Sequence, residues 1–282
     1  MTHPHKLLLI ALSTCLGMGI FGTFFSSRQS SIAQTPTPSP SPTKPPFQEI
    51  LQAGEVRSLP GQLDQIPLFS SNSPEWIKTE GVLLSTFPTS GKKVPAAHLN
   101  VPLQGRFNLF AHHFTHTPKD LQTLYIGVIV QNPGKQAVTL DLLQAASYRM
   151  EPDAPFQNKP QISENPKGEI YSGPGIRAVD TVLRDQRQAG FPSQIVIPAG
   201  QSRMLLNHEI AVKGLSRPVN GRSTFMRLNS SGRVYVASMA MFAKKNSDGS
   251  DRAPTLPEWQ QLLNNGGFAG PRDKTPTPPN QT

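Results

Sequence analysis

Three histidines lie close together in the segment His112-His113-Phe114-Thr115-His116, and histidine is a common metal ligand. To bind one ion, their imidazole nitrogens must converge to about 2.1 Å from it. The neighbouring residues favour a strand, on which His112 and His116 share one face about 13 Å apart and His113 points to the other. A metal site at His112, His113 and His116 therefore needs a turn at Thr115. Without that turn, one imidazole is a hydrogen-bonded core residue and two lie at the strand end.

A second group of reactive side chains lies in or beside the segment 149–175, which has no hydrophobic periodicity. A structureless segment of this length is uncommon in a folded domain and is often functional. Aromatic rings there can stack on sugar rings, while amide and guanidinium groups hydrogen-bond to sugar hydroxyls. The residues that could bind a sugar in this way are Tyr148, Phe156, Asn158, Asn165, Tyr171 and Arg177. The alternative is that the aromatic residues fill the core beneath the segment.

The same segment contains four carboxylates, Glu151, Asp153, Glu164 and Glu169. Hydrolysis of a glycosidic bond needs two carboxyl groups about 5–9.5 Å apart on either side of a groove. Acids in loops are more often solvated surface groups, so a polysaccharide-acting enzyme is a secondary hypothesis. The segment Gly221-Arg222-Ser223-Thr224-Phe225 lacks the last glycine of a nucleophile elbow. We therefore assign no catalytic residue.

The segment Gly173-Pro174-Gly175-Ile176-Arg177-Ala178 matches a loose dinucleotide-binding pattern. That pattern needs a buried strand before it, but Glu169-Ile170-Tyr171-Ser172 is a poor strand. No phosphate-binding loop of the Walker type occurs either. The sequence therefore predicts a Pro/Gly turn that enters a helix, whose N-terminus can hold an anion, and it predicts no cofactor.

Frequent turns between short apolar segments predict a β-rich fold. Proline occurs 29 times, often beside glycine or asparagine, and it is unfavourable inside helices and central strands. The segments 124–131 and 233–243 are apolar on both faces, which indicates a sheet covered on both sides. We predict strands over residues 81–87, 106–114, 124–131, 137–143, 194–197, 203–212, 223–228 and 233–243. The expected fold is one mainly β, sandwich-like domain with two short peripheral α-helices.

The two helices are predicted from their apolar spacing. Residues 176–188 place Ile176, Val179, Val182 and Leu183 on one stripe. The second helix begins at the capping box Thr255-Leu256-Pro257-Glu258 and ends near Gly266. Its apolar face consists of Trp259, Leu262 and Leu263.

The N-terminal residues predict export. A short basic start precedes the apolar residues 7–25, and Ser31 and Ala33 have the small side chains that signal peptidase requires. We predict a signal peptide at 1–33, a Pro/Thr/Ser-rich linker at 34–46, the β-rich domain at 47–271 and a disordered tail at 272–282. Because the apolar run approaches the length of a membrane span, an uncleaved anchor is the alternative. Cys15 is the only cysteine and lies in this run, so the mature chain would have no disulfide.

Charge indicates the kind of partner. The chain has a net charge of +9, which becomes about +7 when Lys6 and Arg28 leave with the signal peptide. The basic residues are scattered, which argues against nucleic acid, and their excess provides either affinity for acidic polymers or only solubility. The leading hypothesis is a non-catalytic, exported cell-envelope protein in the periplasm, outer membrane or extracellular space. It would bind an acidic glycan, another cell-wall polymer or an envelope protein, and would contact the membrane only through an uncleaved N-terminal segment.

Five segments together resemble a domain-of-unknown-function family of exported cyanobacterial proteins. They are Glu55-Val56-Arg57-Ser58-Leu59-Pro60-Gly61-Gln62-Leu63-Asp64, Phe110-Ala111-His112-His113, Gly173-Pro174-Gly175-Ile176-Arg177, Asn220-Gly221-Arg222-Ser223-Thr224 and Gly270-Pro271-Arg272-Asp273. The resemblance extends over residues 47–273. It implies a single domain in the envelope or exterior of a photosynthetic bacterium, and it brings no established activity to any residue.

Overall fold

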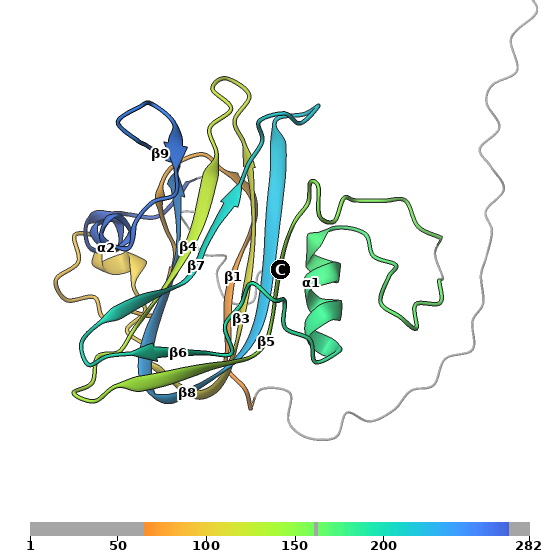
Figure 1. Ribbon diagram of the computed structural model, residues 1–282. Helices are drawn as coiled ribbons and strands as arrows, with labels where there is room; N and C mark the ends of the chain where they lie inside the picture. The colour runs from red at the N-terminus through yellow and green to blue at the C-terminus, as the bar shows by residue number, and fades with distance from the viewer. Residues whose placement is uncertain (1–64, 161–162, 271–282) are drawn as a thin grey trace, which may run out of the picture. The chain divides into compact units, whose positions relative to one another are not determined.

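The computed structural model describes residues 65–160 and 163–270 (Figure 1). The predicted signal peptide, linker and C-terminal tail lie outside these residues, as does the first part of the predicted β-rich domain. None of the helices in the described ranges is long and apolar enough to cross a membrane.

One long strand, β8 (Val219–Phe242), belongs to both layers of the fold. Its first half pairs antiparallel with β3 (Leu103–His116) and β5 (Val138–Arg149). Its second half pairs antiparallel with β4 (Leu124–Gln131) and β2 (Gly81–Ser85). β8 curves between its two halves, so a single chain segment passes from one layer to the other (Figure 1).

The prediction of two separate strands over 223–228 and 233–243 is therefore wrong. The polar residues between them form a bend within β8 rather than a turn. At this bend, the Ser230 hydroxyl donates a hydrogen bond to the Gly232 carbonyl at 2.7 Å. A Cβ atom at Gly232 would lie 2.7 Å from Val138 Cγ2, so the close approach of β5 to the bend requires glycine.

Shorter strands complete the two layers. In the first layer, β1 (Leu68–Ile77) runs parallel to β3, and β6 (Gln194–Ile197) pairs with β5. In the second layer, β7 (Ser202–Ile210) pairs with β4. A separate hairpin is formed by β9 (Lys244–Lys245) and β10 (Asp251–Arg252). The strand β1 was not predicted, because its sequence LFSSNSPEWI is polar and contains a proline.

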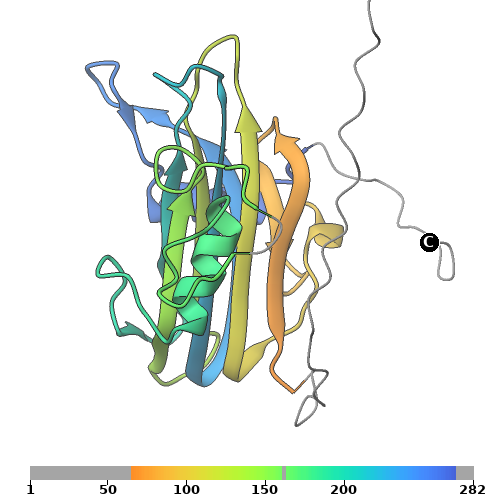
Figure 2. The same ribbon diagram turned by 90° about the vertical axis from the view of Figure 1, so that its right-hand side faces the viewer.

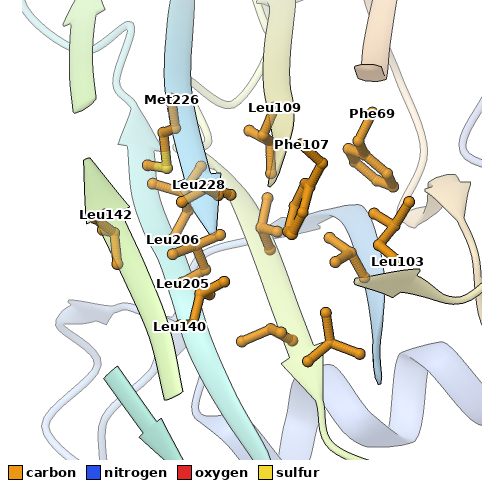
Figure 3. Close-up of a cluster of buried hydrophobic side chains, with 14 of the residues drawn as sticks. Phe69, Leu103, Phe107, Leu109, Leu140, Leu142, Leu205, Leu206, Met226 and Leu228 are labelled. Carbon is orange, nitrogen blue, oxygen red and sulfur yellow. The ribbon is translucent and has the colours of Figure 1, made fainter. Parts of the chain in front are cut away.

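The main hydrophobic core lies between the two layers. Phe107 and Leu109 of β3 and Met226 and Leu228 of β8 pack in this core with side chains from β5 and β7 (Figure 3). Along β3, buried residues alternate with partly exposed ones from Phe107 to His116, as predicted. The prediction of a mainly β, sandwich-like domain with two helices is confirmed.

Helix α2 (Leu256–Asn265) has the predicted boundaries and cap. The Thr255 hydroxyl accepts a hydrogen bond from the Glu258 backbone, the Glu258 carboxylate accepts one from the Thr255 backbone, and Gly266 is the C-cap. Trp259 is fully buried against Gly127, where a Cβ atom would lie 2.5 Å from the indole ring. The helix is thereby fixed to β4.

Helix α1 (Pro174–Leu183) is shorter than predicted and buries a different face. It packs on β5 and β8 and runs roughly along them, while β3 and β1 extend to one side of it (Figure 2). Its buried residues are Pro174, Ala178, Thr181 and Val182, and Ile176 and Leu183 are each 60% exposed. Small side chains face the sheet because the helix packs closely on Ala146 and Tyr148.

Candidate functional site

Three of the six predicted sugar-binding residues come together beside α1. The Arg177 guanidinium carbon lies 4.2 Å from the centroid of the Tyr148 ring and 4.6 Å from that of Tyr171. Arg177 also donates a hydrogen bond from Nη1 to the Asp153 carbonyl. This stack joins α1, the end of β5 and the irregular segment. Because the guanidinium lies over both rings, the stack fastens the segment rather than offering two free ring faces.

The other three predicted residues do not join this stack. Phe156 is 62% exposed and packs on Gly173, at the point where the chain enters α1. Asn165 closes a local turn, since its side chain both donates to and accepts from the backbone of Ile170, at 2.8 and 3.0 Å. Asn158 is exposed. Only three of the six predicted residues therefore lie together.

The three histidines lie on one continuous strand, because β3 extends to His116 without a turn at Thr115. His112 Nδ1 is 2.6 Å from the Ser223 hydroxyl, and burial lowers the pKa of His112. His113 is buried, with Nε2 at 2.8 Å from the Ser71 hydroxyl. His116 stacks edge-on against Trp76 at 4.4 Å. Across residues 65–160 and 163–270, no three His, Cys, Asp or Glu side chains are placed to hold a metal ion.

The four loop acids have separate environments. Asp153 accepts hydrogen bonds from the backbone and side chain of Arg149. Glu151 is partly buried, and its backbone is hydrogen-bonded to the Asn220 side chain. Glu164 and Glu169 are exposed. The acid that shares a cation with Asp153 is Glu209 of β7, whose Oε1 lies 2.8 Å from Arg149 Nη1.

A polar network that the sequence did not predict connects the two layers. Ser147 of β5 lies at its centre, with its hydroxyl 3.2 Å from His208 Nδ1 and 2.7 Å from the Thr224 hydroxyl. Arg222 of β8 donates from Nη1 to this hydroxyl at 3.1 Å and from Nε to the Glu209 carbonyl at 2.9 Å. The network thus crosses from β5 and β8 to β7.

Burial sets the protonation of this network. Burial, together with the charge of Arg222, lowers the pKa of His208 from 6.5 to about 4, so the imidazole is neutral at neutral pH. Burial and the neighbouring Arg149 lower the pKa of Arg222 to about 10, and the carboxylates of Asp153 and Glu209 oppose this shift. Arg222 therefore remains charged. Residues with shifted pKa values often mark functional sites. His208 and Arg222, however, already hydrogen-bond to the Ser147 hydroxyl within the network, so we do not take them as a binding site.

The more accessible candidate is a hollow of about 620 Å³ at the end of the fold where β8 bends. We call it the end hollow. Its lining consists of Pro102, Asn132, Pro133, Gly134, Lys135, Gln136, Ala137, Val138, Ser231, Gly232, Arg233 and Tyr235. It contains two cationic side chains, Lys135 and Arg233, one aromatic ring, and no carboxylate. Both cations are exposed, and neither forms an ion pair within the described part of the chain.

The walls of the end hollow are held in place by hydrogen bonds. The Asn132 side chain is fully buried and donates to the carbonyls of Gln136 and Ile197, at 2.6 and 3.0 Å. Its Oδ1 accepts from the Gly134 backbone at 2.8 Å. Elsewhere in the lining, the exposed Ser231 hydroxyl accepts from the Thr139 backbone at 2.9 Å. The hollow is therefore preorganised rather than formed by loose loops.

The sequence indicated only part of this hollow. The turn at Asn132-Pro133-Gly134 was predicted, but Lys135 and Arg233 are far apart in the chain. Both line the hollow because β8 bends beside the turn that follows β4. The pairing of strands, which no local pattern specifies, brings these two chain segments to one hollow.

Comparison with known proteins gives a family and no activity. No curated protein matches the chain. A family model described as "Protein of unknown function (DUF3370)" matches residues 54–282, which is most of the sequence and includes all described strands and helices. The chain therefore belongs to the DUF3370 family of proteins of unknown function.

Proposed function

We propose that the protein is an exported, non-catalytic component of the cell envelope of a photosynthetic bacterium, and that it binds an acidic glycan. The observation that carries the proposal is the end hollow, whose lining includes Lys135, Arg233 and Tyr235 and no acidic side chain.

The chemistry of the end hollow suits an acidic sugar better than a neutral one. Carboxylate, sulfate and phosphate groups of a glycan are complementary to the exposed cations of Lys135 and Arg233. Tyr235 lines the hollow and is half-buried, with its ring centroid 5.6 Å from that of Phe87, and the part of the ring that stays exposed offers apolar surface to a sugar. The volume of about 620 Å³ is within the range of pockets that hold small ligands, about 300–1,000 Å³.

The N-terminal residues support export, and the net charge supports an acidic partner. Apolar residues followed by Ser31 and Ala33 form a leader, and the excess of basic residues favours the acidic polymers of an envelope. Asp153 accepts hydrogen bonds from Arg149, and Glu164 and Glu169 are exposed, which favours binding without hydrolysis, because glycoside cleavage needs two carboxyl groups across one groove.

Retention on immobilised polysaccharides tests the proposal. The mature protein should be retained on polygalacturonate or an acidic exopolysaccharide at low salt, and not on a neutral galactan, with elution as salt screens the charges. Retention on peptidoglycan is measured in parallel. The double variant Lys135→Gln/Arg233→Gln should elute much earlier, and Tyr235→Ala should weaken binding without changing the net charge.

The matched control is Lys213→Gln/Arg217→Gln, which removes two exposed cations from the segment that follows β7. It should behave like the wild-type protein. No retention of the wild-type protein on any acidic polymer, or equal losses in the two double variants, contradicts the proposal.

A further inference from the structure

We propose that a second hollow, on the outward face of the first layer, binds the carboxylate of a uronic acid unit, and that Asp185 occupies it as an internal competitor. This strand-face hollow has a volume of about 400 Å³. Its lining consists of Ile66, Arg106, Asn108, Leu143, Gln144, Asp185, Arg227 and Leu228. The inference extends the proposed glycan binding to a second site and names the acidic group that is recognised.

A row of hydrogen-bonding side chains forms this hollow. In the register of the sheet, Arg227 of β8 lies opposite Asn108 of β3 on one side and Gln144 of β5 on the other. Side chains at paired positions project from the same face of a sheet, about 4.8 Å apart. Arg106 lies two residues before Asn108 and therefore projects from the same face. The row offers two guanidinium groups and two amides to one ligand.

A β-bulge completes the site. The register of β5 against β8 shifts between Leu142 and Gln144, and the intervening Leu143 is exposed at the edge of the hollow. Such bulges change the direction of side chains locally. Leu143 and the exposed Ile66 supply apolar surface against which the C–H groups of a sugar ring can pack.

Asp185 already places a carboxylate on this row. Its Oδ1 lies 3.4 Å from Arg227 Nη1, and its side chain is 76% exposed. An ion pair with such exposure is weak, so a ligand carboxylate can displace it. Asp185 directly follows the C-cap of α1 and has a φ of 58°, a left-handed conformation that aspartate and asparagine tolerate.

The remaining donors are free to bind a ligand. Within residues 65–160 and 163–270, the side chains of Arg106, Asn108 and Gln144 make no hydrogen bond. The hollow, at about 400 Å³, also has room for much more than a carboxylate group, since one water molecule occupies only about 30 Å³. One sugar ring with its carboxylate on Arg227 and its hydroxyls on the amides accounts for both the volume and the donors.

The decisive variant is Asp185→Asn, because it should increase binding. It removes the competing carboxylate and keeps the left-handed backbone. A gain of affinity cannot result from misfolding. The matched control is Asp180→Asn, which removes the same charge from α1, where Asp180 pairs with Arg184 instead. The variant Arg227→Gln removes the guanidinium from the row.

Affinity is measured by calorimetric titration of the mature protein with a trimer of galacturonic acid. The Lys135→Gln/Arg233→Gln background removes the end hollow from the measurement. We expect Asp185→Asn to bind the trimer several-fold more tightly, Arg227→Gln to bind it about tenfold more weakly or not at all, and Asp180→Asn to be unchanged. Neutral galactotriose should not bind.

The outcomes separate this inference from the proposed function. If the wild-type protein is retained on polygalacturonate but Asp185→Asn and Arg227→Gln leave trimer binding unchanged, the strand-face hollow is not a site, while the end hollow remains one. Equal binding of a short polyglutamate peptide would show that the hollow recognises peptide carboxylates, which overturns the assignment to a sugar. If the Lys135→Gln/Arg233→Gln variant is retained on polygalacturonate as strongly as the wild-type protein while trimer binding is intact, only the first proposal is refuted.

Discussion

Replacing His208 with glutamine should remove a defined part of the acid sensitivity of the protein. Glutamine can still hydrogen-bond to the Ser147 hydroxyl, but it does not titrate. In the folded wild-type protein, burial and Arg222 lower the pKa of His208 from 6.5 to about 4. Between these two values the unfolded chain binds a proton at this residue and the folded chain does not.

The sign and size of the effect follow from this difference. The favourable contribution of neutral His208 is complete above pH 6.5 and is lost as the pH falls toward 4. A shift of about 2.5 pKa units corresponds to about 3 kcal/mol of unfolding free energy. The charge that acts on the imidazole, that of Arg222, is present in both proteins, and Arg222, with a pKa of about 10, stays protonated throughout.

The assay is urea unfolding at several pH values from 7.5 to 4, followed by tryptophan fluorescence, to which the buried Trp259 and the exposed Trp76 contribute. Other groups also titrate in this range, so the informative quantity is the difference in unfolding free energy between the two proteins. The unfolding free energy of the wild-type protein minus that of the variant should fall by about 3 kcal/mol between pH 7.5 and pH 4. Parallel curves for the two proteins would refute the assignment of a neutral, buried imidazole.

Three further predictions concern packing and capping. Gly127→Ala should destabilise the protein by about 1–3 kcal/mol, because the new methyl group meets the Trp259 ring; an unchanged denaturation midpoint would contradict this close packing. Thr255→Ala should cost about 1 kcal/mol by removing the cap of α2, and Thr255→Ser should restore stability in the same urea titration. Arg177→Ala should speed proteolysis within residues 149–175, because the stack on Tyr148 and Tyr171 holds that segment; equal cleavage rates would show that the stack does not.

The elements that the sequence predicted well are those whose own residues determine them. The strand β4 is apolar on both faces and bounded by polar residues, and it was predicted with its observed limits. The cap of α2 was predicted because both partners of the capping box lie within four residues. In each case the signal is local and does not depend on distant chain segments.

The elements that were missed depend on tertiary packing. The face of α1 was mispredicted because hydrophobicity favoured Ile176 and Leu183, whereas close packing on β5 selected Ala178 and Thr181. β8 was predicted as two strands because the polar residues at its bend have the composition of a turn. The stack of Arg177 on two tyrosines lay within the predicted set, but the end hollow and the row beside Arg227 arise only from strand register.

Because β8 serves both layers without interruption, the two sheets share one phase of side-chain alternation. Adding one residue near Gly232 would exchange the inward and outward side chains of one sheet while those of the other kept their places. Insertions are therefore tolerated in the surface loops but not at this bend, and length variation among related sequences should avoid it. The number of residues at the bend therefore sets which side chains face inward in both sheets.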